Sequence, residues 1–465
     1  MPIPLITQGI RDGISSIPYA AHILQVAPWV LILAALKYYF GGARNGSERV
    51  MHSKVVMVTG GTSGIGASVV YELASRGAQV IILTQHSPSD IFLVDYIEDV
   101  RRSTGNHLVF AEQVDLSSLH SIRTFATKWI DNVPARRLDM LILCANTASP
   151  SSSLLSTSPR RVTQDGLDEE WQVNYLSNFH LLSILSPALR AQPAHRDVRV
   201  IFTTCASYMG ARLDLKQADT APVPATHNLP TQSKPKPKSK SSSNQQTPPP
   251  KKKPSSLFGV SKLSLMVFAH TFQKHLNAVK RPDGQPPCTR VLVVDPGFSR
   301  TPGMRRWLTG GSLWGLLFYL ITWPVWWLIL KSPQQGAQSI LYAAMEARYG
   351  RGEGGWMIKE CCEVGYARHE ITDEAVAKRL WEFSEKQIET VETETAIKRA
   401  LATKEKQAQA EAEAQAATPS AGTKDATPGS RRSRKGQNPT STSASASASD
   451  STSAPASAST SSARK

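Results

Sequence analysis

Residues 55–66 read VVMVTGGTSGIG, a buried-strand run followed at once by a glycine-rich turn. The next residues, ASVVYELASRG, have the apolar spacing of a helix that ends at Gly77, and AQVIILT reads as a second strand. Small residues in such a turn let the backbone approach a pyrophosphate and direct free amides and the helix dipole at its charge. The stretch therefore predicts a βαβ unit that binds a dinucleotide.

Four further apolar strands are predicted along the chain, separated by helix-like stretches. They read HLVFAEQVD, MLILCA, VRVIFTT and RVLVVDPG. Strands that alternate with helices from Val55 to Gly297 indicate a parallel sheet with helices on both faces. We therefore predict an α/β fold with a Rossmann-type doubly wound parallel sheet.

The spacing TGxxxGxG at Thr59–Gly66 resembles that of the short-chain dehydrogenase/reductase family. The stretches SPQQGAQSILYAAME at 332–346 and GGWMIKECCEV at 354–364 resemble its retinol dehydrogenase and WW-domain oxidoreductase branch. The resemblance covers about residues 51–389, apart from a lysine-rich insert. It implies that Asn174 is the structural and proton-relay asparagine. It also implies a set of cofactor-binding residues, namely Thr59, Gly60, Ser63, Gly64, Ile65, Gly66, Asp115, Ala145, Lys262, Pro296, Gly297 and Thr301.

The catalytic pair of this family is Tyr-x-x-x-Lys, in which the lysine binds the nicotinamide ribose and lowers the pKa of the tyrosine. Lys262 is in place here, but Phe258 stands at the tyrosine position and has no ionisable group. Cys205, followed by Ser207, aligns with the serine that holds the substrate oxygen. Three interpretations stay open: the chemistry is lost, Tyr208 or a water on Lys262 replaces the phenol, or the true alignment differs beside the insert.

The residues after the second strand bear on the choice of cofactor, because an NAD-preferring site carries an acid there to bind the ribose hydroxyls. This chain has Thr84-Gln85-His86 and no acid at that place. The pattern favours NADP over NAD. No metal site is predicted, because Cys361 and Cys362 are adjacent and lack the spacing of a metal-binding pair.

Two apolar runs predict contact with a membrane. Residues 17–40 are a candidate anchor, and the excess of Lys and Arg downstream leaves the main domain cytosolic if the run spans. Residues 313–330 carry no charge, but a single crossing there would divide the predicted sheet, so we expect a tryptophan-rich interfacial segment kinked at Pro324. The alternative for residues 17–40 is a signal peptide or a helix packed on the domain. The alternative for residues 313–330 is a hydrophobic lid or a dimer face.

The predicted organisation has three parts: an anchor and linker at 1–50, a short-chain dehydrogenase/reductase domain at 51–398, and a low-complexity tail at 399–465. Within the domain, residues 214–256 are predicted to be disordered and 312–331 to interact with a membrane. The formal net charge is +16, but seven lysines and no acid lie between Thr220 and Ser256, and seven basic residues face two acids from Thr418 onward. The folded part is only mildly basic, so no nucleic-acid partner is expected.

Together these features predict a membrane-associated, NADP-preferring oxidoreductase that acts on a lipophilic carbonyl or alcohol. Its catalytic domain is expected to face the cytosol, at the endoplasmic reticulum or a lipid droplet, and the sequence also allows a homodimer. The alternative function is a catalytically impaired nucleotide-binding scaffold or regulator, which the phenylalanine at position 258 favours.

Overall fold

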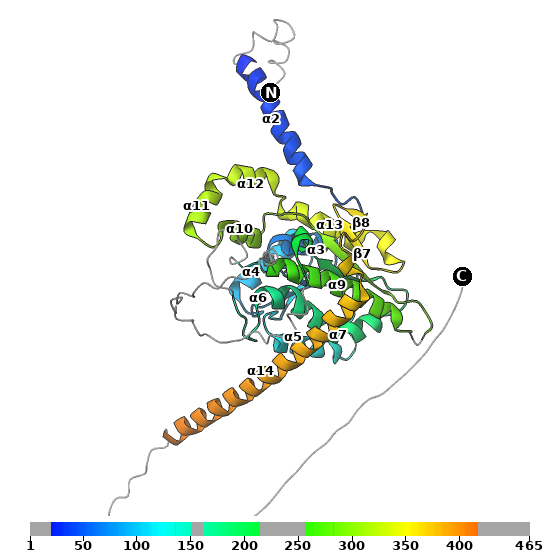
Figure 1. Cartoon of the computed structure of the whole chain (residues 1–465), viewed down its shortest axis with the longest axis vertical. Helices are drawn as coiled ribbons and strands as arrows, with labels where there is room; N and C mark the ends of the chain where they lie inside the picture. Colours follow the sequence, from blue (N-terminus) through cyan, green and yellow to red (C-terminus); the bar gives the residue numbers. More distant parts are fainter. Residues whose placement is uncertain (1–19, 135, 150–160, 214–255, 282, 417–465) are drawn as a thin grey trace, which may run out of the picture. The chain divides into compact units, whose positions relative to one another are not determined.

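The computed structural model describes residues 20–134, 136–149, 161–213, 256–281 and 283–416. The predicted insert, apart from Ser256, lies outside the described residues, and so do the start of the predicted anchor and the tail beyond Ala416. Figure 1 shows the chain with its helices and strands labelled.

One sheet of eight strands organises the described part of the chain, in the order β3-β2-β1-β4-β5-β6-β7-β8 (Figure 1). All neighbours from β3 to β7 are parallel, and β8 pairs antiparallel with β7. The predicted doubly wound parallel sheet is confirmed, and the short β7–β8 hairpin is an addition that the apolar pattern did not identify. The strands are β1 Val55–Thr59, β2 Gln79–Thr84, β3 Val109–Gln113, β4 Met140–Leu143, β5 Val198–Thr203, β6 Thr289–Asp295, β7 Trp356–Lys359 and β8 Cys362–Val364.

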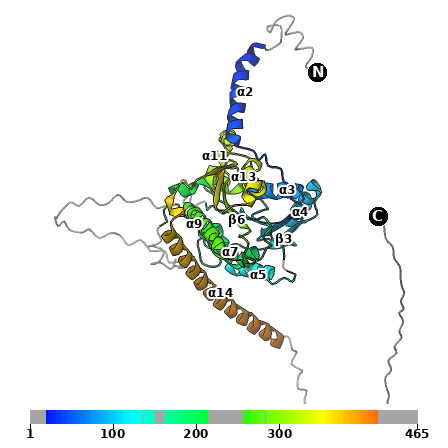
Figure 2. The ribbon, with the colours of Figure 1, turned by 90° about the vertical axis from the view of Figure 1, so that its right-hand side faces the viewer.

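Helices cover both faces of the sheet, because alternate residues of a buried strand point to opposite sides. In β1, Val55 and Met57 join the core formed with α5, α7 and α9, whereas Val56 and Val58 join the core formed with α3, α4 and α13 (Figure 2). The helices are α3 Gly64–Ser75, α4 Ile91–Thr104, α5 Leu119–Ile130, α6 Glu169–Trp171, α7 Ser177–Arg190, α9 Leu257–Ala278, α10 Pro302–Thr309 and α13 Pro333–Met345.

A long helix, α14 (Glu374–Ala416), follows the sheet and continues past residue 398, where the sequence places the start of the tail. Its first turns contribute to the core on the side of α7 and α9. The Trp381 ring lies 5.1 Å from that of Phe179 and 5.7 Å from that of Phe268, measured between centroids. The domain boundary at 398 therefore stays a prediction.

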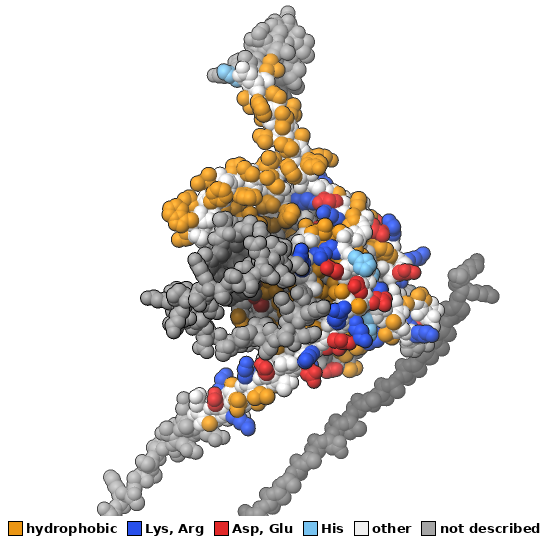
Figure 3. All heavy atoms as spheres, viewed as in Figure 1, with side chains coloured by type: hydrophobic (Ala, Val, Ile, Leu, Met, Phe, Trp, Pro, Cys, Tyr) orange, Lys and Arg blue, Asp and Glu red, His pale blue; other side chains and the backbone are white. Residues whose placement is uncertain are grey.

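Two apolar segments remain largely outside the core. Within α2 (Ala20–Gly41), residues Leu24–Gly41 are long and apolar enough to cross a membrane, the one such helix among the residues described. The second predicted run forms α11 (Leu313–Ile321) and α12 (Trp323–Ile329), which contain no buried residue. The break between them lies just before Pro324, close to the predicted kink. Hydrophobic side chains gather over these segments in Figure 3.

Candidate active site

The glycine-rich turn lies between β1 and α3, at the carboxyl edge of the sheet. Gly60 (φ +66°) and Gly64 (φ +58°) adopt left-handed backbone, which favours glycine. A Cβ at Gly60 would lie 2.8 Å from the Cα of Ala145, and a Cβ at Gly66 would overlap the carbonyl oxygen of Gly60. Close packing among predicted cofactor residues therefore sets the shape of this turn.

Hydrogen bonds hold the same turn from two sides. The backbone N–H of Ala145 donates to the Thr59 hydroxyl at 3.1 Å, and the Tyr96 hydroxyl donates to the Gly61 carbonyl at 2.8 Å. Burial raises the pKa of Tyr96 to about 12, so its hydroxyl keeps its proton. The Ser63 side chain makes no capping hydrogen bond and does not occupy the amides that open α3. Sequence reasoning did not identify Tyr96, which lies on the surface helix α4.

A second turn, after β6, contains the predicted Pro296 and Gly297. The Gly297 amide donates to the buried Asp295 carboxylate at 3.0 Å. Burial raises the pKa of Asp295, and this hydrogen bond opposes the shift. Thr301 then caps α10, and a Cβ at Gly64 would lie 3.2 Å from its Cγ2. The two turns that are expected to contact a dinucleotide therefore meet in the folded chain.

Asn174 is fully buried in a short π-helical stretch, Gln172–Leu176. Its side-chain oxygen accepts a hydrogen bond from the Thr147 amide at 2.8 Å, and its side-chain nitrogen donates to the Thr147 carbonyl at 2.9 Å. The same nitrogen lies 3.4 Å from the Ser261 hydroxyl. Asn174 thus fastens the loop after β4 to α9, directly beside Lys262, and π-helical stretches are frequent at functional sites.

Lys262 and Phe258 lie one turn apart on α9, as the sequence predicts. The Lys262 ammonium donates to the Thr203 carbonyl at 3.2 Å and lies 5.9 Å from the centroid of the Phe258 ring. Lys262 is only 2% exposed. Burial lowers its pKa, and the nearby Cys205 and Cys144 thiols partly oppose that shift. The ring at position 258 is therefore close to the lysine but supplies no proton.

Two thiols lie near this lysine. Cys205 follows β5 and opens a 3₁₀ turn, Ala206–Gly210, and its sulfur lies 2.9 Å from the Ser207 hydroxyl oxygen. Cys144 follows β4, and its sulfur lies 3.5 Å from the Thr203 hydroxyl oxygen. Burial raises the pKa of Cys144 to about 11, so this thiol is protonated at neutral pH. Ser207 thus places a hydroxyl beside Cys205, the residue predicted to align with the family's serine.

Tyr208, an alternative proton donor, lies in the same 3₁₀ turn and is 4% exposed. Burial, followed by the Asp295 charge, raises its pKa. The Arg368 guanidinium donates to the Tyr208 carbonyl at 3.0 Å and also to the Ala211 carbonyl, which fixes the backbone of the turn. Arg368 was not identified from the sequence, because a charged residue before a short turn carries no distinctive signal.

Two predicted cofactor residues make other contacts. Asp115 follows β3, and one of its carboxylate oxygens accepts hydrogen bonds from the Ser117 amide at 2.8 Å and the Ser117 hydroxyl at 2.7 Å. Ile65 faces α13, where its side chain would lie 3.3 Å from a Cβ at Gly336. Binding of the cofactor by Asp115 therefore stays a prediction.

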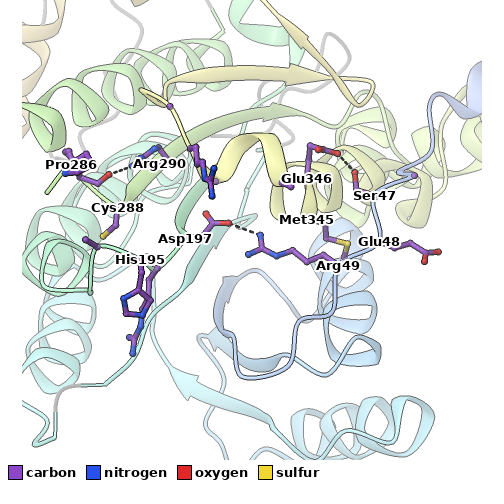
Figure 4. A pocket seen from close by; sticks show the side chains of 18 residues that line it. Ser47, Glu48, Arg49, His195, Asp197, Pro286, Cys288, Arg290, Met345 and Glu346 are labelled. Atoms are coloured by element: carbon purple, nitrogen blue, oxygen red, sulfur yellow. Dashed lines mark hydrogen bonds and ion pairs between the residues drawn. The ribbon is translucent and has the colours of Figure 1, made fainter.

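A cavity of about 1160 Å³ lies at the opposite edge of the sheet, where β5 and β6 begin (Figure 4). The Arg49 guanidinium points to the Asp197 carboxylate across it, at 2.8 Å, and Ser47 donates to Glu346. None of the predicted site residues lines this cavity. It is separate from the two turns that are predicted to bind the cofactor.

Similarity to known proteins agrees with this geometry. The family model described as short chain dehydrogenase matches residues 54–210. The chain is 39% identical to the uncharacterized oxidoreductase pbr1 of Schizosaccharomyces pombe, over 87% of this chain and 100% of that protein. It is 27% identical to retinol dehydrogenase 13 of Mus musculus, over 74% of this chain and 87% of that protein. It is 28% identical to polyprenol dehydrogenase of Mus musculus, over 70% of this chain and 82% of that protein.

Proposed function

This chain belongs to the short-chain dehydrogenase family, and we propose that it is a membrane-associated oxidoreductase that uses NADP and acts on a lipophilic carbonyl or alcohol. One observation carries the proposal. The glycine loop, the Asn174 contacts and the buried Lys262 ammonium lie together at the carboxyl ends of neighbouring parallel strands. Ligands bind at this edge in open α/β sheets, where the strand order reverses.

The crevice residues fit a nicotinamide dinucleotide. Gly60, Gly64 and Gly66 leave bare backbone beside the first turn of α3, where amides and the helix dipole stabilise a diphosphate. Lys262 would hold the ribose next to the nicotinamide, and Thr301 would lie along the ring. The bound cofactor supplies or accepts a hydride, and the residues of the chain orient the substrate and move the proton.

The proton step is the part of the site that departs from the family. Phe258 has no acidic proton, and Cys205 provides a thiol, which is a weak hydrogen-bond donor. We assign the hydrogen bond to the substrate oxygen to the Ser207 hydroxyl. We assign the proton to a water held by Lys262, because the lowered pKa of Lys262 makes its ammonium a stronger acid than an ordinary lysine. Loss of a general acid costs about two to four powers of ten in rate, so a slow enzyme is compatible with this site.

The preference for NADP rests on the end of β2. His86 follows β2, and its Nδ1 lies 3.3 Å from the Asp90 carboxylate. Asp90 also accepts a hydrogen bond from the Phe92 amide and so caps α4. This acid is therefore engaged in the loop, and no acid stands at Thr84-Gln85-His86 to bind a ribose 2′-hydroxyl.

Membrane association and a lipophilic substrate are proposed from the two apolar segments. α2 is long enough to anchor the chain, and the tryptophans of α11 and α12 suit the headgroup boundary. Retinol dehydrogenase 13 and polyprenol dehydrogenase, two of the relatives, are named for lipophilic alcohols. We propose that the catalytic domain faces the cytosol, at the endoplasmic reticulum or a lipid droplet. A homodimer stays a proposal.

The second candidate is a nucleotide-binding scaffold or regulator, and Phe258 is the observation that favours it. Such a protein would bind NADPH in the same crevice and turn over no substrate. A scaffold needs the glycine contacts described above to hold the nucleotide. It needs neither a catalytic phenol nor a serine that binds a substrate oxygen.

The full chain in phosphatidylcholine nanodiscs provides the test. We expect NADPH to bind at least about tenfold more tightly than NADH, and NADPH oxidation to occur with retinal or a long-chain aldehyde. NADPH binding without turnover of retinal, a sterol ketone or long-chain aldehydes would contradict the enzyme hypothesis and support the scaffold hypothesis. Absence of NADPH and NADH binding would contradict both.

A further inference from the structure

Four segments that are distant in the sequence meet at one junction: the exit of α2 at Gly42, the turn at Gly297, the end of the α10–α12 segment at Lys331, and the β7–β8 hairpin at Glu360. The Lys331 ammonium pairs with one carboxylate oxygen of Glu360. The other oxygen accepts a hydrogen bond from the Ala43 amide at 3.1 Å. A single carboxylate thus holds both the lysine and the backbone that leaves the anchor helix.

The junction is tightly packed. Gly42 (φ +71°) has no space for a side chain, because a Cβ there would overlap the Glu360 carboxylate and the Lys331 ammonium. A Cβ at Gly297 (φ +75°) would lie 3.1 Å from that ammonium nitrogen. Lys331 is 8% exposed, so loss of Glu360 would remove the carboxylate that pairs directly with a buried charge. Glu360 itself has φ +51°, a strained backbone for a residue with a side chain, which surrounding contacts must maintain.

The segment that carries α10, α11 and α12 also begins and ends at this junction. Ser299 and Lys331 form a parallel bridge, and the Arg300 amide donates to the Lys331 carbonyl at 2.9 Å. The neighbouring carbonyl, of Leu330, lies 3.5 Å from the Lys37 ammonium of α2. Lys37 also donates to the last turn of α12 and lies over the ring of its Trp327. The anchor helix and the apolar helices therefore both make contacts at Lys331 or at the residue next to it.

From these contacts we infer that Lys331 and Glu360 are positioning residues. They couple the position of α2, α11 and α12 on a bilayer to the conformation of the turn at Gly297. The inference rests on the proposed cofactor site, because Gly297 is one of the residues expected to bind the cofactor. A shift of the apolar helices moves the bridge at Ser299, and Lys331 transmits that shift to the turn. NADPH is therefore expected to bind more tightly in a bilayer than in detergent.

Hydrogen exchange on the full chain in phosphatidylcholine nanodiscs tests the coupling without cofactor. Lys331→Met, Glu360→Gln and Gly42→Ala should each speed amide exchange at residues 297–301 by about tenfold or more, because the turn loses its support. Gly105→Ala is the matched glycine control, since it has φ +69° and no atom within 4 Å of an added Cβ. Lys274→Met is the matched lysine control, from an exposed pair with Glu374. Both controls should leave exchange at 297–301 unchanged.

The second measurement is the Kd of NADPH for the same variants. Lys331→Met should raise it by about tenfold, and the charge-swapped pair Lys331→Glu with Glu360→Lys should recover most of the loss. Unchanged exchange at 297–301 in Lys331→Met overturns the coupling, whatever the cofactor does. Faster exchange with no NADPH binding by the wild type keeps the coupling and contradicts the proposed function instead. A lower Tm without faster exchange or a higher Kd also overturns the coupling, since both residues would then be merely structural.

Discussion

The two halves of the crevice differ in how closely they follow the family. The nucleotide half retains the glycine loop, and Gly60, Gly64 and Gly66 are each fixed by a positive φ or by contact with a neighbouring backbone. In the substrate half, the resemblance predicts that Phe258 and Cys205 stand at the positions of the family's tyrosine and serine. We therefore expect the glycine loop to govern cofactor binding and the residues around Phe258 and Cys205 to govern proton transfer, with Lys262 serving both, and variants can test the two halves separately.

The largest effect is expected in the nucleotide half. Gly66→Val places a Cβ on the Gly60 carbonyl, so the loop cannot keep its shape, and the Kd of NADPH should rise by at least about 100-fold. Gly365→Ala is the control, because no atom lies within 4 Å of its added Cβ. Thermal unfolding of both variants separates loss of the loop from loss of the fold. Wild-type affinity in a folded Gly66→Val variant would contradict the assignment of this loop.

A smaller loss is expected at Lys262, where the two halves meet. Lys262→Met should raise the Kd of NADPH by about tenfold or more, because the ammonium can no longer bind the ribose. The wild-type pKa of Lys262 is lowered by burial. Affinity should therefore be present while the amine is protonated and fall as the pH rises through a pKa below the usual lysine value of about 10.4.

The same pH series supplies the control for the lysine. Lys262→Met should show no such fall, and Lys262→Arg should move it to higher pH, because arginine stays protonated up to about pH 12. Isothermal titration across the series measures each Kd. A wild-type Kd independent of pH up to the usual lysine value would show that the ammonium does not bind the cofactor.

A gain of function is expected in the substrate half. Phe258→Tyr puts a hydroxyl on a ring whose centroid is 5.9 Å from the Lys262 ammonium. Turnover of a long-chain aldehyde should rise by about tenfold to 100-fold, since a general acid is restored, with the Kd of NADPH unchanged. Phe258→Leu should give no rise. Activity that appears only with tyrosine identifies the parent as a scaffold, whereas an unchanged rate shows that another donor already suffices.

The smallest effect is expected at Cys205. Cys205→Ser replaces a weak donor with a hydroxyl 2.9 Å or so from Ser207, and kcat should rise by a factor of about two to five. Cys205→Ala should lower kcat, and Cys362→Ser, at an exposed thiol, should leave it unchanged. A rate unaffected by Ser and Ala alike would place the substrate oxygen away from this residue.

Several features could be predicted from the sequence because they depend on local spacing. An apolar strand followed by TGGTSGIG and a helix specifies a βαβ unit, and its repetition specifies the parallel sheet. The four-residue separation of Phe258 and Lys262 places both on one helix face, whatever the rest of the chain does. The missing phenol is likewise a property of the sequence alone.

Other features were decided only by the tertiary structure, because they join residues with no regular separation. Tyr96 reaches the Gly61 carbonyl from a surface helix, and Arg368 holds the turn after β5 from beyond the last strand. The Lys331–Glu360 junction unites four segments that become neighbours only after the sheet has formed. Local sequence sets backbone preference and apolar periodicity, whereas the partner of a buried charge is fixed by long-range packing, which no local pattern encodes.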